Sequence, residues 1–122
     1  MSYVLIVEDE EEIRELLVEQ MKMLGHRVIS AHDGADAYLK AANQKFDLIC
    51  TDYMMPKLNG AQLIAKLRDN KFNSKTPIIV YTAFLEPAMD ACEHFPNIHF
   101  VPKPSLGGEL EETIWQLTQS GE

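Results

Sequence analysis

The chain has 122 residues, of which 46% are hydrophobic and 25% are charged, a composition typical of one folded globular domain. The formal net charge is −8 and no run of lysine or arginine offsets it, which argues against direct binding of nucleic acid. No apolar run reaches the roughly 18 residues of a membrane-spanning helix, and we expect no signal peptide. Cys50 and Cys92 lack metal-ligand spacing, so we expect reduced thiols in a cytoplasmic protein.

Short segments rich in valine, isoleucine and aromatic residues alternate with helical patterns. The predicted strands are residues 3–7, 28–31, 46–50, 78–81 and 98–101. The first, third and fourth are almost continuously apolar, as in strands covered on both faces. The predicted helices are residues 10–24, 35–42 and 88–95, one beginning after Asn59 and one beginning near Gly108, and Pro87 suits a first helical turn. Five strand–helix repeats predict one α/β domain over residues 1–122 with a parallel sheet.

The first helix carries the clearest apolar stripe, and Gly25 supplies its stop. We expect the stripe to face the core with Ile13, Leu16, Leu17, Met21 and Leu24.

Polar residues end four of the predicted strands. Glu8 and Asp9 end the first, Asp52 the third and Thr82 the fourth, while the fifth leads to Lys103. Ligand sites of open parallel sheets form beyond the carboxyl ends of the strands, so we expect three carboxylates, a hydroxyl and an ammonium to converge.

Such a cluster has a definite chemistry. Clustered carboxylates repel one another unless a cation intervenes, and hard oxygen ligands suit Mg²⁺. An aspartate can attack a phosphoryl centre, and the metal, ammonium and hydroxyl would then neutralise the phosphoryl oxygens. A single aspartate, threonine or lysine at a strand end is usually structural, and the residues alone leave binding of a cation open as a second interpretation.

The motifs together resemble the response-regulator receiver family over essentially the whole chain. The matching segments are Val4-Leu5-Ile6-Val7-Glu8-Asp9-Glu10, Asp52-Tyr53-Met54-Met55-Pro56 with Asn59-Gly60, Pro77-Ile78-Ile79-Val80-Tyr81-Thr82-Ala83, and Lys103-Pro104. The resemblance implies a flavodoxin-like, doubly wound sheet of five parallel strands in the order 2-1-3-4-5, with five helices.

The resemblance also assigns roles to individual residues. Asp52 matches the phosphoacceptor, and Thr82 and Lys103 match the residues that grip the phosphoryl group. Glu8, Asp9, Asp52 and the backbone carbonyl of Met54 match the Mg²⁺ site. The Lys103–Pro104 peptide bond is expected to be cis.

Thr82 and Phe100 match the switch pair of the family. Phosphorylation is expected to shift a population between two packings of the fourth helix, fifth strand and fifth helix, and that face would meet a partner. The implied partners are a sensor histidine kinase or phosphotransfer protein upstream and a protein partner or effector domain downstream, with no direct contact to nucleic acid or membrane.

Several residues depart from the usual family pattern. Pro102 stands where an aliphatic residue is usual, Ser105 replaces a common phenylalanine, and residues 94–99 lack a small-residue turn. Pro102 is tolerable only if the fifth strand lies at the sheet edge.

Three large apolar residues suggest more specific hypotheses. Met54 and Phe84 each follow a site residue by two positions, and we expect them to prolong the lifetime of an aspartyl phosphate by limiting water access. The alternative is that both only pack against loops. Trp115 lies beside the stripe of the last helix, so we expect it to be partly exposed, either widening the core edge or anchoring a partner.

Two other functions compete with phosphorelay signalling. A receiver-like adaptor that docks partners without phosphorylation could lose any of Asp9, Asp52, Thr82 and Lys103, so the intact set argues against it. An aspartate-nucleophile phosphatase needs a second aspartate two residues after the nucleophile, where Met54 stands. The sequence therefore predicts a phosphoacceptor signalling domain that assists its own phosphorylation and dephosphorylation, and not a turnover enzyme.

Overall fold

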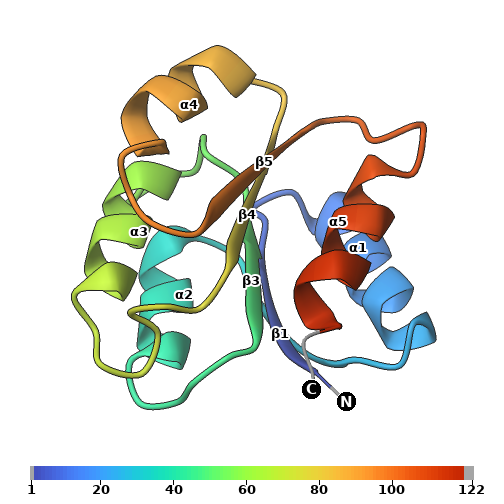
Figure 1. The fold of residues 1–122 in the computed structure, drawn as a ribbon, viewed down its shortest axis with the longest axis horizontal. Helices are drawn as coiled ribbons and strands as arrows, with labels where there is room; N and C mark the ends of the chain where they lie inside the picture. Colours follow the sequence, from blue (N-terminus) through green and yellow to red (C-terminus); the bar gives the residue numbers. More distant parts are fainter. Residues whose placement is uncertain (1, 120–122) are drawn as a thin grey trace.

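A computed structural model describes residues 2–119 and contains one parallel sheet covered by helices on both faces (Figure 1). The strands are β1 (Tyr3–Val7), β2 (Arg27–Ala31), β3 (Leu48–Thr51), β4 (Ile78–Thr82) and β5 (Ile98–Pro102), in the order β2-β1-β3-β4-β5. The helices are α1 (Glu11–Met23), α2 (Gly34–Ala41), α3 (Gly60–Arg68), α4 (Leu85–Cys92) and α5 (Glu109–Thr118). Neighbouring strands all pair in parallel, which confirms the predicted flavodoxin-like topology.

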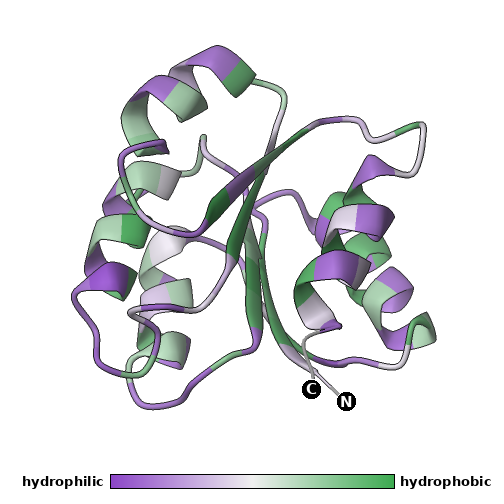
Figure 2. Cartoon of the chain, viewed as in Figure 1, coloured by the Kyte–Doolittle hydropathy of each residue, from purple (hydrophilic) through white to green (hydrophobic). Residues whose placement is uncertain are grey.

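The sheet separates two apolar layers. Helices α2, α3 and α4 cover one face, and α1 and α5 cover the other (Figure 1). Alternate residues of β1 serve the two sides: Leu5 packs in the layer beneath α3, whereas Ile6 packs with Leu17 of α1. Figure 2 shows the apolar residues concentrated along the central strands, with polar residues on the outer faces of the helices. Both faces of the sheet are therefore buried, as the continuous apolar strands predicted.

The largest differences from the predicted bounds lie at β3 and α4, whereas the other predicted bounds agree with the structure to within one residue. β3 begins at Leu48, because the Phe46 backbone N–H donates to Asn73 Oδ1 at 3.0 Å and lies outside the strand ladder. α4 begins at Leu85, earlier than residue 88, and ends at Cys92. Pro87 does lie in the first turn of α4, where a missing N–H costs no helical hydrogen bond.

The predicted stripe of α1 is partly wrong. Leu17 and Met21 are buried and Ile13 packs partly against them, but Leu16 is 70% exposed and Leu24 is 53% exposed. Successive helical residues lie about 100° apart, so Leu16 cannot share the face that Leu17 presents to the sheet. Leu24 is the C-cap residue of the helix and does not continue its buried face.

Two sequence-based expectations about composition agree with the structure. Cys50 and Cys92 are both buried as free thiols. Burial raises the pKa of the Cys50 thiol to about 12 and that of Cys92 to about 11, which keeps both thiols protonated and unreactive. No helix within residues 2–119 has the length and apolar character required to span a bilayer.

Pro102 lies in the edge strand β5, opposite Thr82 of β4. The next residue, Lys103, donates its backbone N–H to the Thr82 carbonyl at 2.9 Å. Because backbone N–H groups alternate in direction along a strand, the nitrogen of Pro102 faces the open edge. The missing donor therefore costs no hydrogen bond of the sheet.

The buried Asn73 side chain joins three segments near the starts of β3 and β4. Its Oδ1 accepts from Phe46 N, and its Nδ2 donates to the carbonyls of Ala41 and Gln44 at 2.9 Å each. These bonds hold the end of α2 and the approach to β3 against the chain that precedes β4.

We expect Asn73→Ala to lower the free energy of unfolding by about 2–4 kcal/mol, because it leaves buried backbone groups unpaired. Asn43→Ala, at an exposed position, is the matched control and should change stability by no more than about 0.5 kcal/mol. Urea denaturation of both variants measures the difference, and equal midpoints would contradict this role of Asn73.

Candidate functional site

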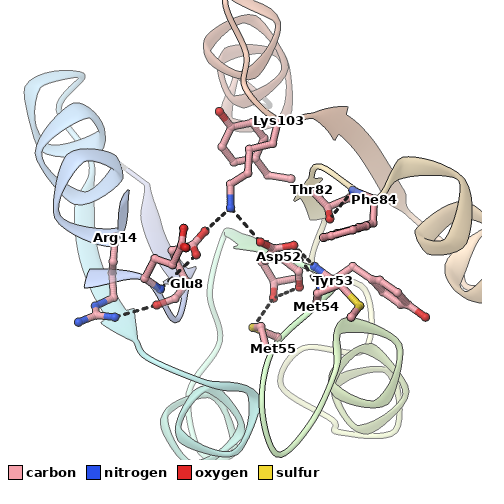
Figure 3. Close-up of polar contacts among 12 residues, drawn as sticks. Glu8, Arg14, Asp52, Tyr53, Met54, Met55, Thr82, Phe84 and Lys103 are labelled. Atoms are coloured by element: carbon pink, nitrogen blue, oxygen red, sulfur yellow. Dashed lines mark hydrogen bonds and ion pairs between the residues drawn. The ribbon is translucent and has the colours of Figure 1, made fainter. Parts of the chain in front are cut away.

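The carboxyl ends of three strands bring two carboxylates and one ammonium into contact. Glu8 follows β1, Asp52 follows β3 and Lys103 follows β5. Lys103 Nζ lies 2.7 Å from Glu8 Oε1 and 2.8 Å from Asp52 Oδ2, and Figure 3 shows the three side chains pointing toward one another. Their side chains are only 14%, 2% and 11% exposed for Lys103, Glu8 and Asp52, so the ion pairs are shielded from solvent.

Burial and pairing act in opposite directions on these charges. Burial raises the pKa of Glu8, and the hydrogen bond and charge of Lys103 offset this only in part. Burial alone would lower the pKa of Lys103, but its hydrogen bonds to Asp52 and Glu8 outweigh that effect and the pKa is raised. The lysine is therefore held in its charged form. The cost of burying a negative charge falls mainly on the Glu8 carboxylate.

The loop that follows Asp52 fixes the orientation of its carboxylate. Asp52 Oδ1 accepts from the backbone N–H of Tyr53 at 2.6 Å and of Met54 at 3.3 Å. Gly60, the first residue of α3, donates its N–H to the Tyr53 carbonyl at 2.7 Å. A Cβ at position 60 would lie 2.9 Å from Tyr53 Cα and 3.0 Å from the Asp52 carbonyl oxygen, so only glycine allows this approach.

Thr82 lies at the end of β4, next to the ion pairs. Its side chain is fully buried, and Oγ1 accepts a hydrogen bond from the Phe84 N–H at 3.1 Å. Phe100 pairs in register with Val80 and is partly buried against the apolar layer under α3 and α4. The two predicted switch residues thus lie on neighbouring strands: Thr82 lies beside the charged cluster, and Phe100 lies on the face covered by α2, α3 and α4.

Met54 and Phe84 lie near Asp52 in Figure 3. Each side chain is 52% exposed, so neither is absorbed into the core. The structure thus leaves both apolar side chains at the solvent side of the site.

Asp9 is placed differently from the other two carboxylates. It follows Glu8 with an exposed side chain, and among the carboxylates of residues 2–119 the ones that bond to Lys103 are Glu8 and Asp52. Within residues 2–119, no group of three or more His, Cys, Asp and Glu side chains is arranged to hold a metal ion. The donor chemistry nevertheless fits a hard cation, because carboxylates end β1 and β3 and the raised pKa of Glu8 marks a negative charge that a cation would stabilise.

Two residues at the site escaped the sequence analysis. The Tyr81 ring centroid lies 5.6 Å from Lys103 Nζ, and its hydroxyl oxygen accepts from Ser105 N–H at 3.1 Å, so Tyr81 holds both the lysine head and the chain just after it. Arg14 of α1 donates to the Glu8 carbonyl at 2.8 Å (Figure 3). Two features of the sequence could have pointed to these residues. Tyr81 carries a hydroxyl within an otherwise apolar strand, and Arg14 is a single basic residue near the acidic start of the first helix.

Sequence comparison identifies the family. Residues 4–114 match the profile of the response regulator receiver domain. The chain belongs to this family. Receiver domains are signalling domains of two-component systems and not classical enzymes, which agrees with the expected class of function.

Curated relatives show the same relationship. The chain is 42% identical over 80 residues to the alkaline phosphatase synthesis transcriptional regulatory protein PhoP of Bacillus subtilis, covering 66% of this chain and 32% of that protein. It is 41% identical over 83 residues to the transcriptional regulatory protein CpxR of Escherichia coli, covering 68% of this chain and 34% of that protein. The receiver domain thus spans about a third of these relatives.

Solved structures share the fold over nearly the whole chain. The chemotaxis response regulator CheY4 of Vibrio cholerae has a TM-score of 0.87 at 27% identity and covers 96% of this chain and 98% of its own. The receiver domain of the sensor histidine kinase PA1611 from Pseudomonas aeruginosa, with a magnesium ion coordinated in its active site cleft, has a TM-score of 0.88 at 27% identity and covers 98% of both chains. In the present chain, the Lys103–Pro104 peptide bond is cis, as the family resemblance implies.

Removing the ammonium tests the electrostatics of the site. We expect Lys103→Met to lower the free energy of unfolding by about 3 kcal/mol at about pH 7, because Glu8 and Asp52 are left as an uncompensated buried pair. Since burial raises the folded-state pKa of Glu8, its carboxylate takes up a proton in the folded domain as the solution is acidified, so the loss should shrink as the pH falls.

Chemical denaturation at a series of falling pH values measures the effect. Lys45→Met, which removes an exposed lysine elsewhere, is the control and should show no such recovery. A loss that is independent of pH would mean that Lys103 acts through packing.

Proposed function

We propose that this receiver domain accepts a phosphoryl group on Asp52 from a histidine kinase or phosphotransfer protein, in a reaction that requires Mg²⁺. The observation that carries the proposal is the contact of Lys103 Nζ with Asp52 Oδ2 at 2.8 Å, in a site that also contains the hydroxyl of Thr82. An oriented carboxylate beside an ammonium and a hydroxyl is the arrangement that phosphoryl transfer to aspartate needs.

The transfer itself is a displacement at phosphorus. A carboxylate oxygen of Asp52 forms the new P–O bond while the P–N bond to the donor histidine breaks, and its electron pair leaves on the imidazole nitrogen. The Tyr53 and Met54 amides hold Asp52 Oδ1 and so restrict rotation of the carboxylate. Lys103, kept charged by its hydrogen bonds, would then turn from the free carboxylate to a phosphoryl oxygen.

The metal would be held by Glu8, Asp9, Asp52 and the backbone carbonyl of Met54. When bound, Mg²⁺ supplies positive charge that stabilises the phosphoryl oxygens during transfer. Solved receivers with magnesium support this cofactor, among them the PA1611 domain and the TrrA protein of Thermotoga maritima in complex with Mg²⁺ and BeF. The long, buried Glu8 side chain already reaches Lys103 directly, so the metal and the ammonium would share its carboxylate.

The output of the domain is a change at the face formed by α4, β5 and α5. Thr82 Oγ1 now accepts from Phe84 N, and its hydroxyl would donate to the phosphoryl group, drawing the end of β4 toward Asp52. Phe100, only partly buried on the adjacent edge strand, would move into the space that this shift opens. Phosphorylation therefore selects between two packings, and a downstream protein partner or effector domain recognises one of them.

Intact mass spectrometry tests the phosphoacceptor. After incubation with acetyl phosphate and Mg²⁺, we expect a single phosphoryl adduct on the wild type and none on Asp52→Asn, because the amide is a poor nucleophile. Omitting Mg²⁺ should abolish the adduct. The control Asp47→Asn, at an exposed aspartate outside the site, should be modified like the wild type.

Two results would contradict the proposal. An adduct that persists in Asp52→Asn would place the modification elsewhere. A folded domain that gives no adduct with acetyl phosphate or with a phosphorylated histidine phosphotransfer protein would favour the phosphorylation-independent adaptor.

The exposed apolar side chains near Asp52 lead to a kinetic prediction. We expect the double variant Met54→Asn with Phe84→Asn to lose the phosphoryl group about tenfold faster, equivalent to about 1.4 kcal/mol in the barrier, because polar side chains admit and orient water. Met23→Asn, an 85% exposed apolar position on α1, is the control. Decay of the adduct is followed by mass after the donor is removed, and unchanged decay would mean that both residues only pack against loops.

A further inference from the structure

The segment that follows Lys103 is tied to Tyr81 on one side and to the start of α5 on the other. Tyr81 precedes Thr82 on β4 and is buried in the apolar layer under α1 and α5, which also contains Leu110. Its side chain therefore lies on the face of the sheet opposite to Phe100. The proposed switch through Thr82 and Phe100 does not use the contacts of Tyr81.

Tyr81 contacts the segment at two points. Its ring centroid lies 5.6 Å from Lys103 Nζ, and its hydroxyl oxygen accepts a hydrogen bond from the Ser105 N–H at 3.1 Å. The backbone adds a third contact, because the Lys103 N–H donates to the Thr82 carbonyl at 2.9 Å. The end of β4 thus holds both the lysine and the residue two positions after it.

Ser105 extends this contact to α5. Gly108 is the N-cap residue of α5 and makes no side-chain cap hydrogen bond. The Ser105 hydroxyl oxygen instead accepts from the Leu110 N–H at 2.9 Å, and the hydroxyl donates to Glu109 Oε1 at 3.3 Å. Acceptance of a hydrogen bond from a first-turn N–H is the usual role of an N-cap side chain. Ser105 therefore supplies the cap that Gly108 lacks.

These hydrogen bonds connect the end of β4 to the first turn of α5 without a gap. The Tyr81 hydroxyl holds the Ser105 backbone, and the Ser105 hydroxyl holds the Leu110 backbone. The rest of the loop lies open to solvent: Leu106 is 89% exposed, and a Cβ added at Gly108 would meet nothing within 4 Å. The two hydroxyl groups are therefore the anchors of this loop.

We propose that Tyr81 and Ser105 are positioning residues whose hydroxyl groups couple the phosphorylation site to the start of α5. Through them, the position of the Lys103 ammonium and the position of the first turn of α5 are set together. The inference rests on the proposed phosphorylation of Asp52. It adds a route to α5 that runs on the opposite face of the sheet from Phe100.

Phosphorylation would displace the groups on both sides of Tyr81. Lys103 would turn toward a phosphoryl oxygen, and Thr82 would be drawn toward Asp52. Because the Tyr81 hydroxyl is bonded to the Ser105 N–H, a shift of Tyr81 also moves Ser105 and the first turn that it caps. Such coupling is reciprocal, so a partner that fixes the start of α5 would in turn favour one position of the lysine.

Hydrogen exchange tests the contact between Ser105 and α5. Ser105→Ala removes the cap, whereas Ser105→Thr keeps a hydroxyl on the same carbon. We expect the Leu110 amide to exchange with deuterium about tenfold faster in Ser105→Ala, and within about twofold of the wild-type rate in Ser105→Thr.

Amide shifts on phosphorylation test the coupling itself. ¹⁵N spectra are recorded before and after incubation with acetyl phosphate and Mg²⁺, and intact mass gives the phosphorylated fraction. We expect the phosphorylation-dependent shift of the Leu110 amide to fall at least about threefold in Ser105→Ala and in Tyr81→Phe, which keeps the ring. The Phe84 amide, next to Thr82, should still shift in both variants.

Two comparisons separate coupling from a general effect on the fold. Ser105→Thr should restore the Leu110 shift, because it restores the hydroxyl. Tyr38→Phe, which removes a tyrosine hydroxyl from α2, is the control for Tyr81→Phe and should respond like the wild type. A purely structural role would alter stability without a loss confined to the shift at α5.

Three results would overturn the proposal. An equal Leu110 shift in Ser105→Ala and in the wild type would mean that α5 responds by another route. Unchanged exchange of the Leu110 amide in Ser105→Ala would mean that the hydroxyl does not hold the helix. A folded wild type without a phosphoryl adduct would overturn the proposed function and the coupling with it, and the intact mass distinguishes this result from the other two.

Discussion

The site is organised around the Lys103 ammonium, which joins the ends of three strands through two carboxylates. Glu8 at β1 and Asp52 at β3 lie across the centre of the sheet, and Lys103 reaches them from beyond the edge strand β5. Without a positive charge at this point, two buried negative charges would face each other. The same arrangement is poised for chemistry, since a cation that leaves one carboxylate can stabilise a phosphoryl group in its place. Stability and reactivity thus depend on one side chain.

The alternation of apolar strands and helices was enough to predict the layers and element order, because buried parallel strands must be apolar on both faces. The strand order came from family resemblance. Errors occurred where a tertiary contact replaced a local pattern. Phe46 resembles a strand residue, but its N–H bonds to Asn73. Leu16 matches the helical spacing, yet its side chain is exposed and that of Leu17 packs against the sheet. In both cases the outcome depends on contacts with another part of the fold, and a pattern of neighbouring residues in the sequence contains no information about them.

The candidate site was predictable for a different reason. Residues at the ends of parallel strands must gather at one edge, so the meeting of Asp52, Glu8 and Lys103 follows from topology. Which carboxylate bonds to the ammonium does not follow, because it depends on side-chain length: Glu8 reaches Lys103, whereas Asp9 is exposed. The role of Tyr81 was missed because it depends on contacts of its ring with Lys103 and of its hydroxyl with Ser105, which both lie in the loop after β5.

The proline that departs from the family pattern has a consequence beyond the ladder of β5. An edge strand exposes donors and acceptors that could template pairing with another polypeptide. Pro102 removes the donor that would point outward at the end of this edge, and its ring occupies the space in which an incoming strand would lie. Beside Lys103, this end of the β5 edge is therefore protected against addition of another strand. The same residue that departs from the family pattern thus lowers the risk of edge-to-edge association at this position.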